Sequence, residues 1–211
     1  MKWNFLLEAI GDEPVFSSNL LMAGRQSRAN IQLQLSRWVK AGKIIQLRRG
    51  WYMLAVPFRK VNAHPFLIAN RLKNASYISL QSALAFYGMI PEYVPVVTSI
   101  TTGRPEVVKN SEGTFAYRHI KKSLFNGYVN LKVADGQSIF IATPEKSLQD
   151  LIYLTPGSQE MAFMQELRLQ NLDQLDMEKL GEMAAVSGSS KLQSAVKQVG
   201  EIIKTEEYSD L

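Results

Sequence analysis

The sequence predicts an α+β protein of two units, and three features of the 211 residues lead to this fold class. Near the N-terminus, apolar residues recur at helical spacing and are followed at once by two short strand-like segments. Strand-like segments separated by turn residues then fill the middle of the chain, and helical spacing returns towards its end. We therefore expect a small helix-and-hairpin domain followed by a mixed α+β domain that ends in a helical segment.

The first elements are two helices. Apolar spacing predicts a helix over residues 3–10 that stops at Gly11. Ser17 or Ser18 can cap a second, short helix, and Gly24 supplies the sharp turn that follows it. These helices would complete a three-helix core with the next element.

The third helix is the most informative stretch of the chain. Ser27 is a good N-cap and Gly42 a good stop, and an apolar stripe between them is formed by Ile31, Leu35, Trp38 and Val39. Residues 43–47 and 51–55 then read as two strands around an Arg-Arg-Gly turn. A helix that leads directly into a basic hairpin is typical of the recognition helix and wing of a winged helix-turn-helix domain.

The charge pattern supports DNA binding independently. No Asp or Glu lies between Glu13 and Glu92, whereas eleven basic residues do: Arg25, Arg28, Arg37, Lys40, Lys43, Arg48, Arg49, Arg59, Lys60, Arg71 and Lys73. A surface without carboxylates suits a polyanion, because carboxylates would repel phosphate and weaken counterion release. The net charge runs from +7 over residues 1–60 through +3 over 61–155 to −5 over 156–211, which indicates two roles on one chain.

The face of the third helix opposite its apolar stripe carries Gln26, Asn30, Leu33 and Arg37. Asn and Gln can pair with adenine edges and Arg with guanine, so this face can read bases as well as contact phosphate. The predicted DNA-binding residues are Arg25, Gln26, Ser27, Arg28, Asn30, Arg37, Arg48 and Arg49. The alternative is a solvated basic face in a small domain of another kind.

A connector around residue 62 divides the chain into predicted domains 1–61 and 62–211. In the second domain, helices are expected over 66–72 and 80–87, the latter capped by Ser79. Strands are expected over residues 94–102, 106–109, 115–120, 128–133 and 138–142.

The predicted elements continue to the end of the chain. Asp135-Gly136 indicates a tight hairpin, and Thr143 caps a helix with Pro144 at its first position. A helical segment of about residues 157–205 follows, with helices over 159–169, 177–186 and 192–203. This acidic end could bind a basic partner, cover the core of the second domain, or keep the chain soluble.

Several classes of function are excluded or disfavoured. The chain has no cysteine and no apolar stretch long enough to cross a bilayer, and its start lacks the pattern of a signal peptide, so we expect a cytoplasmic protein without membrane contact. His64 and His119 lack the spacing of a metal pair, and ordinary hydrogen-bonded or exposed histidines are the default. No phosphate-binding glycine motif appears, and we expect no metal, cofactor or catalytic residue.

Two weaker patterns concern the second domain. Asp135, Glu145 and Lys146 invite comparison with metal-dependent nucleases, but the Glu-Lys pair is adjacent and begins a helix, so capping explains it better. Tyr117, Arg118 and Tyr128 form an aromatic and basic cluster along the strands, which is either a partner surface or plain strand packing.

The segments 77–88, 115–120, 125–128 and 142–151, read as YISLQSALAFYG, FAYRHI, FNGY and ATPEKSLQDL, resemble the AbiEi-type antitoxin family. This family belongs to the type IV abortive-infection toxin–antitoxin systems of bacteria. The motifs occur in the expected order, and with the winged domain ahead of them the resemblance covers residues 15 to 155.

The resemblance implies an N-terminal winged helix that binds inverted repeats in its own promoter and represses it. It also implies a C-terminal domain that counters a cognate nucleotidyltransferase-like toxin, directly or indirectly. By position, the DNA contacts would come from residues 25–37 and from Arg48 and Arg49. The alternatives are a winged-helix regulator with a ligand-sensing C-terminal domain and, more remotely, a metal-dependent nuclease.

Overall fold

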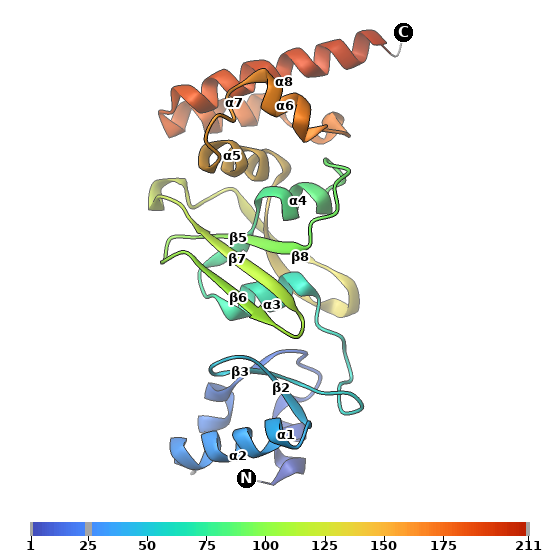
Figure 1. Cartoon of the computed structure of the whole chain (residues 1–211), viewed down its shortest axis with the longest axis vertical. Helices are drawn as coiled ribbons and strands as arrows, with labels where there is room; N and C mark the ends of the chain where they lie inside the picture. Colours follow the sequence, from blue (N-terminus) through green and yellow to red (C-terminus); the bar gives the residue numbers. More distant parts are fainter. Residues whose placement is uncertain (1, 24–26, 210–211) are drawn as a thin grey trace.

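The computed structural model of the chain describes residues 2–23 and 27–209, and it confirms the α+β class. Three parts follow one another along the longest axis: the N-terminal elements, a large sheet, and a layer of C-terminal helices (Figure 1). Within the described ranges, no helix combines the length and the apolar character that crossing a bilayer would require.

Over its described residues, 2–23 and from 27 on, the N-terminal unit contains two α-helices, one 3-10 helix and three strands. In chain order they are α1 (Trp3–Ile10), β1 (Phe16–Ser17), η1 (Ser18–Ala23), α2 (Arg28–Lys40), β2 (Ile44–Arg48) and β3 (Trp51–Leu54). The strands form an antiparallel sheet in the order β1-β3-β2. Strand β1 was not predicted, because its two residues are too few to show alternation.

Helix α2 has the ends that the sequence predicts. The Ser27 hydroxyl accepts a hydrogen bond from the backbone N–H of Asn30 at 3.3 Å, and Gly42, with φ of 67°, follows the last turn. The stripe formed by Ile31, Leu35 and Trp38 is buried and packs with α1 and β2 in a compact apolar core. The opposite face of α2 therefore stays in solvent.

The C-terminal unit is built on a six-stranded mixed sheet. Its strands are β4 (Ser76–Ile78), β5 (Val96–Thr101), β6 (Glu106–Asn110), β7 (Gly113–His119), β8 (Tyr128–Lys132) and β9 (Ser138–Ala142), in the spatial order β6-β7-β5-β4-β9-β8. Its α-helices are α3 (Pro65–Leu72), α4 (Leu80–Phe86), α5 (Pro144–Leu154), α6 (Met161–Leu167), α7 (Met177–Ser187) and α8 (Ser190–Ser209). Three short 3-10 turns lie between these elements: η2 (Lys122–Leu124) between β7 and β8, η3 (Ala134–Gly136) between β8 and β9, and η4 (Leu172–Gln174) between α6 and α7.

Two details near β4 differ from the prediction. Residues 76–78, for which no strand was predicted, form one of the two middle strands of the sheet, and all three are buried. Ser79 does not cap α4; its hydroxyl donates a hydrogen bond to the Asp150 carboxylate at 2.8 Å. The hydroxyl of an N-cap residue accepts a backbone N–H, whereas the Ser79 hydroxyl is turned towards Asp150 and donates to a charged acceptor, so the tertiary contact replaces the local one.

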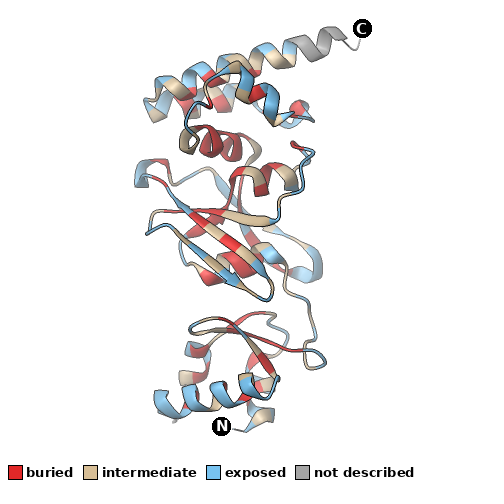
Figure 2. Ribbon diagram, viewed as in Figure 1, coloured by how far each residue is buried: buried red, intermediate tan, exposed pale blue. Residues whose placement is uncertain are grey.

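The two faces of the large sheet are covered by different helices. Helix α3 packs on one face against Ile78, Phe115 and Tyr117, whereas α4 and α5 pack on the other (Figure 1). Helix α5 is buried over most of its length, as the colours of Figure 2 show. Thr143 caps α5 by accepting a hydrogen bond from the backbone N–H of Lys146, as predicted.

The C-terminal helices α6 to α8 cover the outer side of α4 and α5. Met164, Leu180 and Leu192 are buried in one apolar core with residues of α5. Glu145 at the start of α5 pairs with Lys179 of α7 at 2.8 Å. Of the three roles left open for the acidic end, the structure therefore shows that it covers the core of the C-terminal unit.

The two units meet through the small sheet. Leu47 and Met53 of the small sheet are buried with Leu67 and Ile68 of α3. The Asn110 side chain of β6 donates a hydrogen bond to the carbonyl of Leu47 at 3.1 Å. The hairpin β2–β3 therefore lies between α2 and the large sheet instead of projecting freely from the molecule (Figure 1).

Candidate nucleic-acid interface

The outer face of α2 is exposed, as a recognition helix requires. Asn30, Leu33 and Arg37, which the sequence places opposite the apolar stripe, are all exposed, and Leu33 retains 53% of its accessible surface. Arg28 is exposed at the first turn. Arg25 and Gln26, two further predicted DNA-binding residues, lie outside the described residues. The Ser27 hydroxyl caps α2 by accepting the hydrogen bond from the backbone N–H of Asn30.

A polar groove of about 480 Å³ lies between α2 and the turn of the hairpin. One wall carries Arg28, Gln32 and Ser36, which follow one another at intervals of four residues along one side of the helix. The other wall carries Gln46 and Arg49. Two arginines with amide and hydroxyl groups between them suit a sugar-phosphate backbone, because each can donate hydrogen bonds to phosphate oxygens.

Arg48 does not share this surface, which corrects the prediction that it projects with Arg49. Its guanidinium is partly buried and donates to the carbonyl of Leu72 at 2.8 Å and to the carboxylate of Glu106 at 3.3 Å. The cause is a bulge: Gln46 pairs with Tyr52 and Arg48 with Trp51, so Leu47 is an extra residue in β2. Arg49, one residue later, remains exposed.

The interval between Glu13 and Glu92, called the acid-free interval below, contains more basic residues than are available to DNA. Five of its basic side chains pair with carboxylates from outside the interval: Arg48, Arg59, Lys60, Arg71 and Lys73. Lys43 lies with its Nζ 5.0 Å from the ring of Trp3. Over residues 2–23 and 27–209, the basic side chains of the interval with no carboxylate partner or aromatic contact are Arg28, Arg37, Lys40 and Arg49. All four lie on α2 or at the hairpin turn, so the free positive charge is concentrated there.

Glu106 organises the pairing at the junction. Its carboxylate lies 2.6 Å from the Lys73 ammonium and 3.3 Å from the Arg48 guanidinium. The hydrogen bond from Lys73, aided by the charge of Arg48, holds the pKa of the Glu106 carboxyl below its ordinary value. The junction therefore contains a compact network of two cations around one carboxylate.

Of the two interpretations of Tyr117, Arg118 and Tyr128, the partner surface is wrong, and plain strand packing describes the two tyrosines. Tyr117 is 1% exposed, and its hydroxyl donates to the carbonyl of Ala69 under α3. Arg118, the next residue of β7, is exposed and lies on the opposite face of the strand. Tyr128 belongs to β8 at the far edge of the sheet, where it stacks on Tyr77 with ring centroids 4.7 Å apart. These three side chains do not form one surface.

A buried polar cluster joins α5 to the large sheet. The Lys146 ammonium lies 2.7 Å from the Asp150 carboxylate, and both side chains are fully buried. The hydroxyls of Tyr77 and Ser79 donate to the same carboxylate at 2.9 and 2.8 Å. Burial raises the pKa of the Asp150 carboxyl, and the Lys146 ammonium and the two hydroxyls oppose that shift. Because these side chains are buried and bonded to one another, the cluster holds α5 against the large sheet.

The residues considered for a nuclease are dispersed. Asp135 is exposed in the β8–β9 hairpin, whereas Glu145 accepts hydrogen bonds from Thr143 and Lys179 at the start of α5. His64 caps α3 through its ring nitrogen, and His119 contacts the carbonyl of Gly103. Across the described ranges, no group of three or more His, Cys, Asp or Glu side chains could hold a metal ion.

Sequence reasoning missed several residues of the groove, namely Gln32, Ser36, Gln46 and Asn74. Gln32 and Ser36 could have been found from the helical spacing that relates them to Arg28. Asn74 could not, because it follows α3 in the C-terminal unit and reaches the groove through the packing of the two units.

The comparisons with known proteins assign no identity, since neither a family model nor a curated protein matches the chain.

Proposed function

We propose that the protein is a DNA-binding transcriptional regulator whose N-terminal unit is a winged helix-turn-helix domain. One observation supports the proposal: of the basic side chains between Glu13 and Glu92 that the structure describes, those without a carboxylate or aromatic partner lie on α2 and at the hairpin turn, beside a polar groove. The element order, with α2 followed by the hairpin β2–β3, is that of a recognition helix and wing. Helix α2 would lie in the major groove.

The roles of the individual side chains follow from their chemistry. Arg28 and Arg49 on the two walls of the groove would contact phosphates, which fixes the position of the domain without selecting a sequence. Asn30 and Arg37 face away from the N-terminal core and would reach base edges, together with Gln32. Arg48 would hold the hairpin on the C-terminal unit and make no contact with DNA.

We further propose that the chain is an antitoxin that represses its own operon and counters a nucleotidyltransferase-like toxin. The support is the resemblance of its motifs to the AbiEi-type family, and these motifs lie in the C-terminal unit, the last of them at the end of β9 and in α5. A regulator whose C-terminal unit senses a small ligand would use the same DNA interface. We propose no catalytic role.

An electrophoretic shift assay on the region upstream of the protein's own gene tests DNA binding. We expect a shift at low salt that Arg28→Ala combined with Arg49→Ala weakens and that Lys132→Ala, an exposed cation on β8, leaves unchanged. Absence of binding at low salt would overturn the regulator proposal. Co-expression with an adjacent nucleotidyltransferase-like reading frame tests the antitoxin part, because growth should fail with that frame alone and recover with both.

A further inference from the structure

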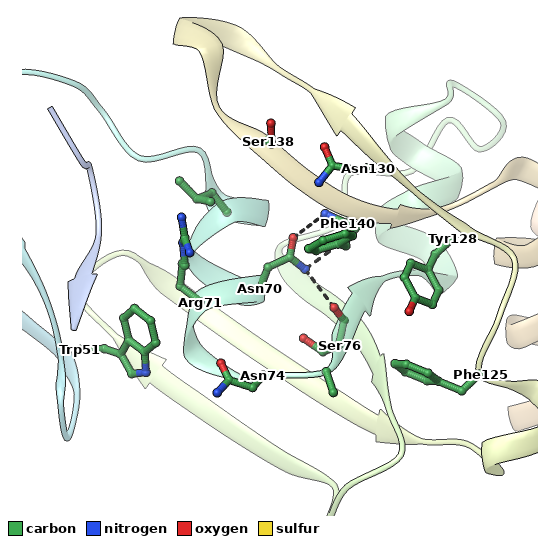
Figure 3. Close-up of a pocket in the computed structure, with 12 residues that line it drawn as sticks. Trp51, Asn70, Arg71, Asn74, Ser76, Phe125, Tyr128, Asn130, Ser138 and Phe140 are labelled. Atoms are coloured by element: carbon green, nitrogen blue, oxygen red, sulfur yellow. Dashed lines mark hydrogen bonds between the residues drawn. The ribbon is translucent and has the colours of Figure 1, made fainter. Parts of the chain in front are cut away.

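A second hollow of the molecule, of about 470 Å³, opens between the end of α3 and the hairpin β8–β9. It forms where the short strand β4 ends and leaves the edge of β9 without a neighbouring strand. The Asn70 side chain takes the place of that strand: its amide accepts a hydrogen bond from the backbone N–H of Phe140 at 2.7 Å and donates one to the Phe140 carbonyl at 3.3 Å (Figure 3). The hollow is therefore built by specific contacts and does not depend on a ligand to form.

The hollow contains a rigid aromatic platform. Tyr128 lines it with a ring that is stacked on Tyr77 at an interplanar angle of 14°, and the Tyr77 hydroxyl is anchored to Asp150. Phe140 stands nearly perpendicular to Tyr128 and is 44% exposed (Figure 3). Large aromatic side chains that are exposed around a hollow and held in place are suited to stacking on a planar ligand.

Two asparagines at the rim of the hollow have side chains that are available to a ligand. Within the described part of the chain, the side-chain amides of Asn74 and Asn130 make no hydrogen bond, and both residues are exposed at the rim. An amide can donate and accept at once, which matches the edge of a nucleobase. Among the residues that the structure describes, the lining contains one cation, Arg71, and no carboxylate. Arg71 is 46% exposed and its nearest carboxylate, from Glu13, lies at 3.7 Å, so this weak pair can give way to a phosphate.

We propose that this hollow binds a nucleoside phosphate, with the base on Tyr128, the base edge at Asn74 and Asn130, and the phosphate at Arg71. Its volume lies in the range of small-molecule sites. The lack of carboxylates disfavours a divalent cation, and the free amides disfavour a purely apolar ligand. The hollow shares Trp51 and Asn74 with the groove beside α2, so a bound nucleotide would lie next to the DNA interface.

Isothermal titration calorimetry on the full chain without DNA tests the proposal, so its outcome is independent of DNA binding. The probes are AMP, GMP, CMP and UMP, with ribose 5-phosphate and inorganic phosphate as arms that lack the base. We expect saturable binding of at least one nucleotide with a Kd below about 1 mM. Binding of ribose 5-phosphate should be at least about fivefold weaker, because it cannot stack.

Three variants link binding to the hollow. Tyr128→Leu and Asn130→Ala should each weaken the binding of the best nucleotide by at least about fivefold. Asn130→Ala changes an exposed side chain that makes no hydrogen bond within the described part of the chain. Tyr93→Ala removes a ring that is 89% exposed outside the hollow and should leave binding unchanged. The proposal is overturned if no nucleotide saturates, if ribose 5-phosphate binds equally well, or if Asn130→Ala binds as the unchanged chain does.

Discussion

Arg48 of β2 reaches across the junction of the two units to Glu106 of β6, with 3.3 Å between Nη2 and Oε2. Its neighbour Arg49 is exposed at the same turn. Two adjacent arginines that look equivalent in the sequence therefore have different roles, one in the contact between units and one on the surface.

This division leads to a prediction about salt dependence. We expect Arg49→Ala to reduce the slope of log affinity against log salt by about 1, because one phosphate contact is lost. Arg48→Ala should leave that slope unchanged and lower the melting temperature instead. Fluorescence anisotropy on a labelled duplex at several salt concentrations, with thermal unfolding of each variant, measures both effects. Equal slopes for Arg49→Ala and the unchanged chain would contradict the assignment.

Glu106 should make stability depend on pH at the acidic end. Because folding lowers its pKa, its pairing stabilises the native state fully above the ordinary carboxyl value of 4.5 and is lost as the pH falls through the lower native value. Glu106→Gln should cost about 1 kcal/mol at pH 7, a modest figure because the side chain is 30% exposed, and the difference should vanish in acid.

Denaturant unfolding from pH 7 to pH 3 measures that difference in the free energy of unfolding. Glu178→Gln, which changes an exposed glutamate at the start of α7, is the matched control and should have little effect. A difference for Glu106→Gln that stays constant down to pH 3 would show that the ionised carboxylate is not what stabilises the junction.

Most of the helices and strands could be predicted from local signals in the sequence. Caps and stops such as Ser27, Gly42 and Thr143 act within a few residues, so the helix ends could be predicted from them. Strand β4 could not, because three buried residues show no alternation and its partners are remote in the sequence.

The candidate interface could be predicted in part for the same reason. The exposure of Asn30 and Arg37 follows from the period of α2 alone. The withdrawal of Arg48 depends on a bulge and on Glu106, which lies 58 residues later. The count of basic residues could not anticipate which of them would pair with carboxylates that folding brings from outside the acid-free interval.

Breaking the buried pair of Lys146 and Asp150 should destabilise the C-terminal unit strongly. We expect Lys146→Met to cost about 3–5 kcal/mol, because it leaves a buried carboxylate without its counter-charge. Lys132→Met on the exposed edge strand is the control and should change stability by less than about 0.5 kcal/mol. Chemical denaturation measures both, and similar values for the two variants would refute the structural role of the cluster.

The C-terminal helices should contribute directly to the stability of the unit that they cover. Leu192 of α8 is 1% exposed in the shared core, so Leu192→Ala should cost about 2–5 kcal/mol. Val186 of α7 is 82% exposed, and Val186→Ala should cost less than about 0.5 kcal/mol. If the two substitutions had equal effects on the melting temperature, α8 would not be an integral part of the C-terminal unit.

The side of α2 that lines the groove should contribute to base recognition. Gln32 is exposed between Arg28 and Ser36, within reach of whatever lies beside the arginines of the groove. A glutamine in the major groove can form two hydrogen bonds to adenine, so we expect Gln32→Ala to lose about 1–3 kcal/mol of discrimination at one base pair. Its affinity for unrelated duplexes should hardly change, since no charge is removed.

Selection of binding sequences from a random duplex library, followed by affinity measurements on the selected and unrelated duplexes, separates these effects. Arg28→Ala is the informative comparison, because it should weaken binding to both kinds of duplex and leave the preferred sequence the same. If Gln32→Ala behaved like Arg28→Ala, the groove would serve only to bind phosphate. Base recognition would then have to come from Asn30 and Arg37 on the other side of α2, which would change how the helix is oriented in the major groove.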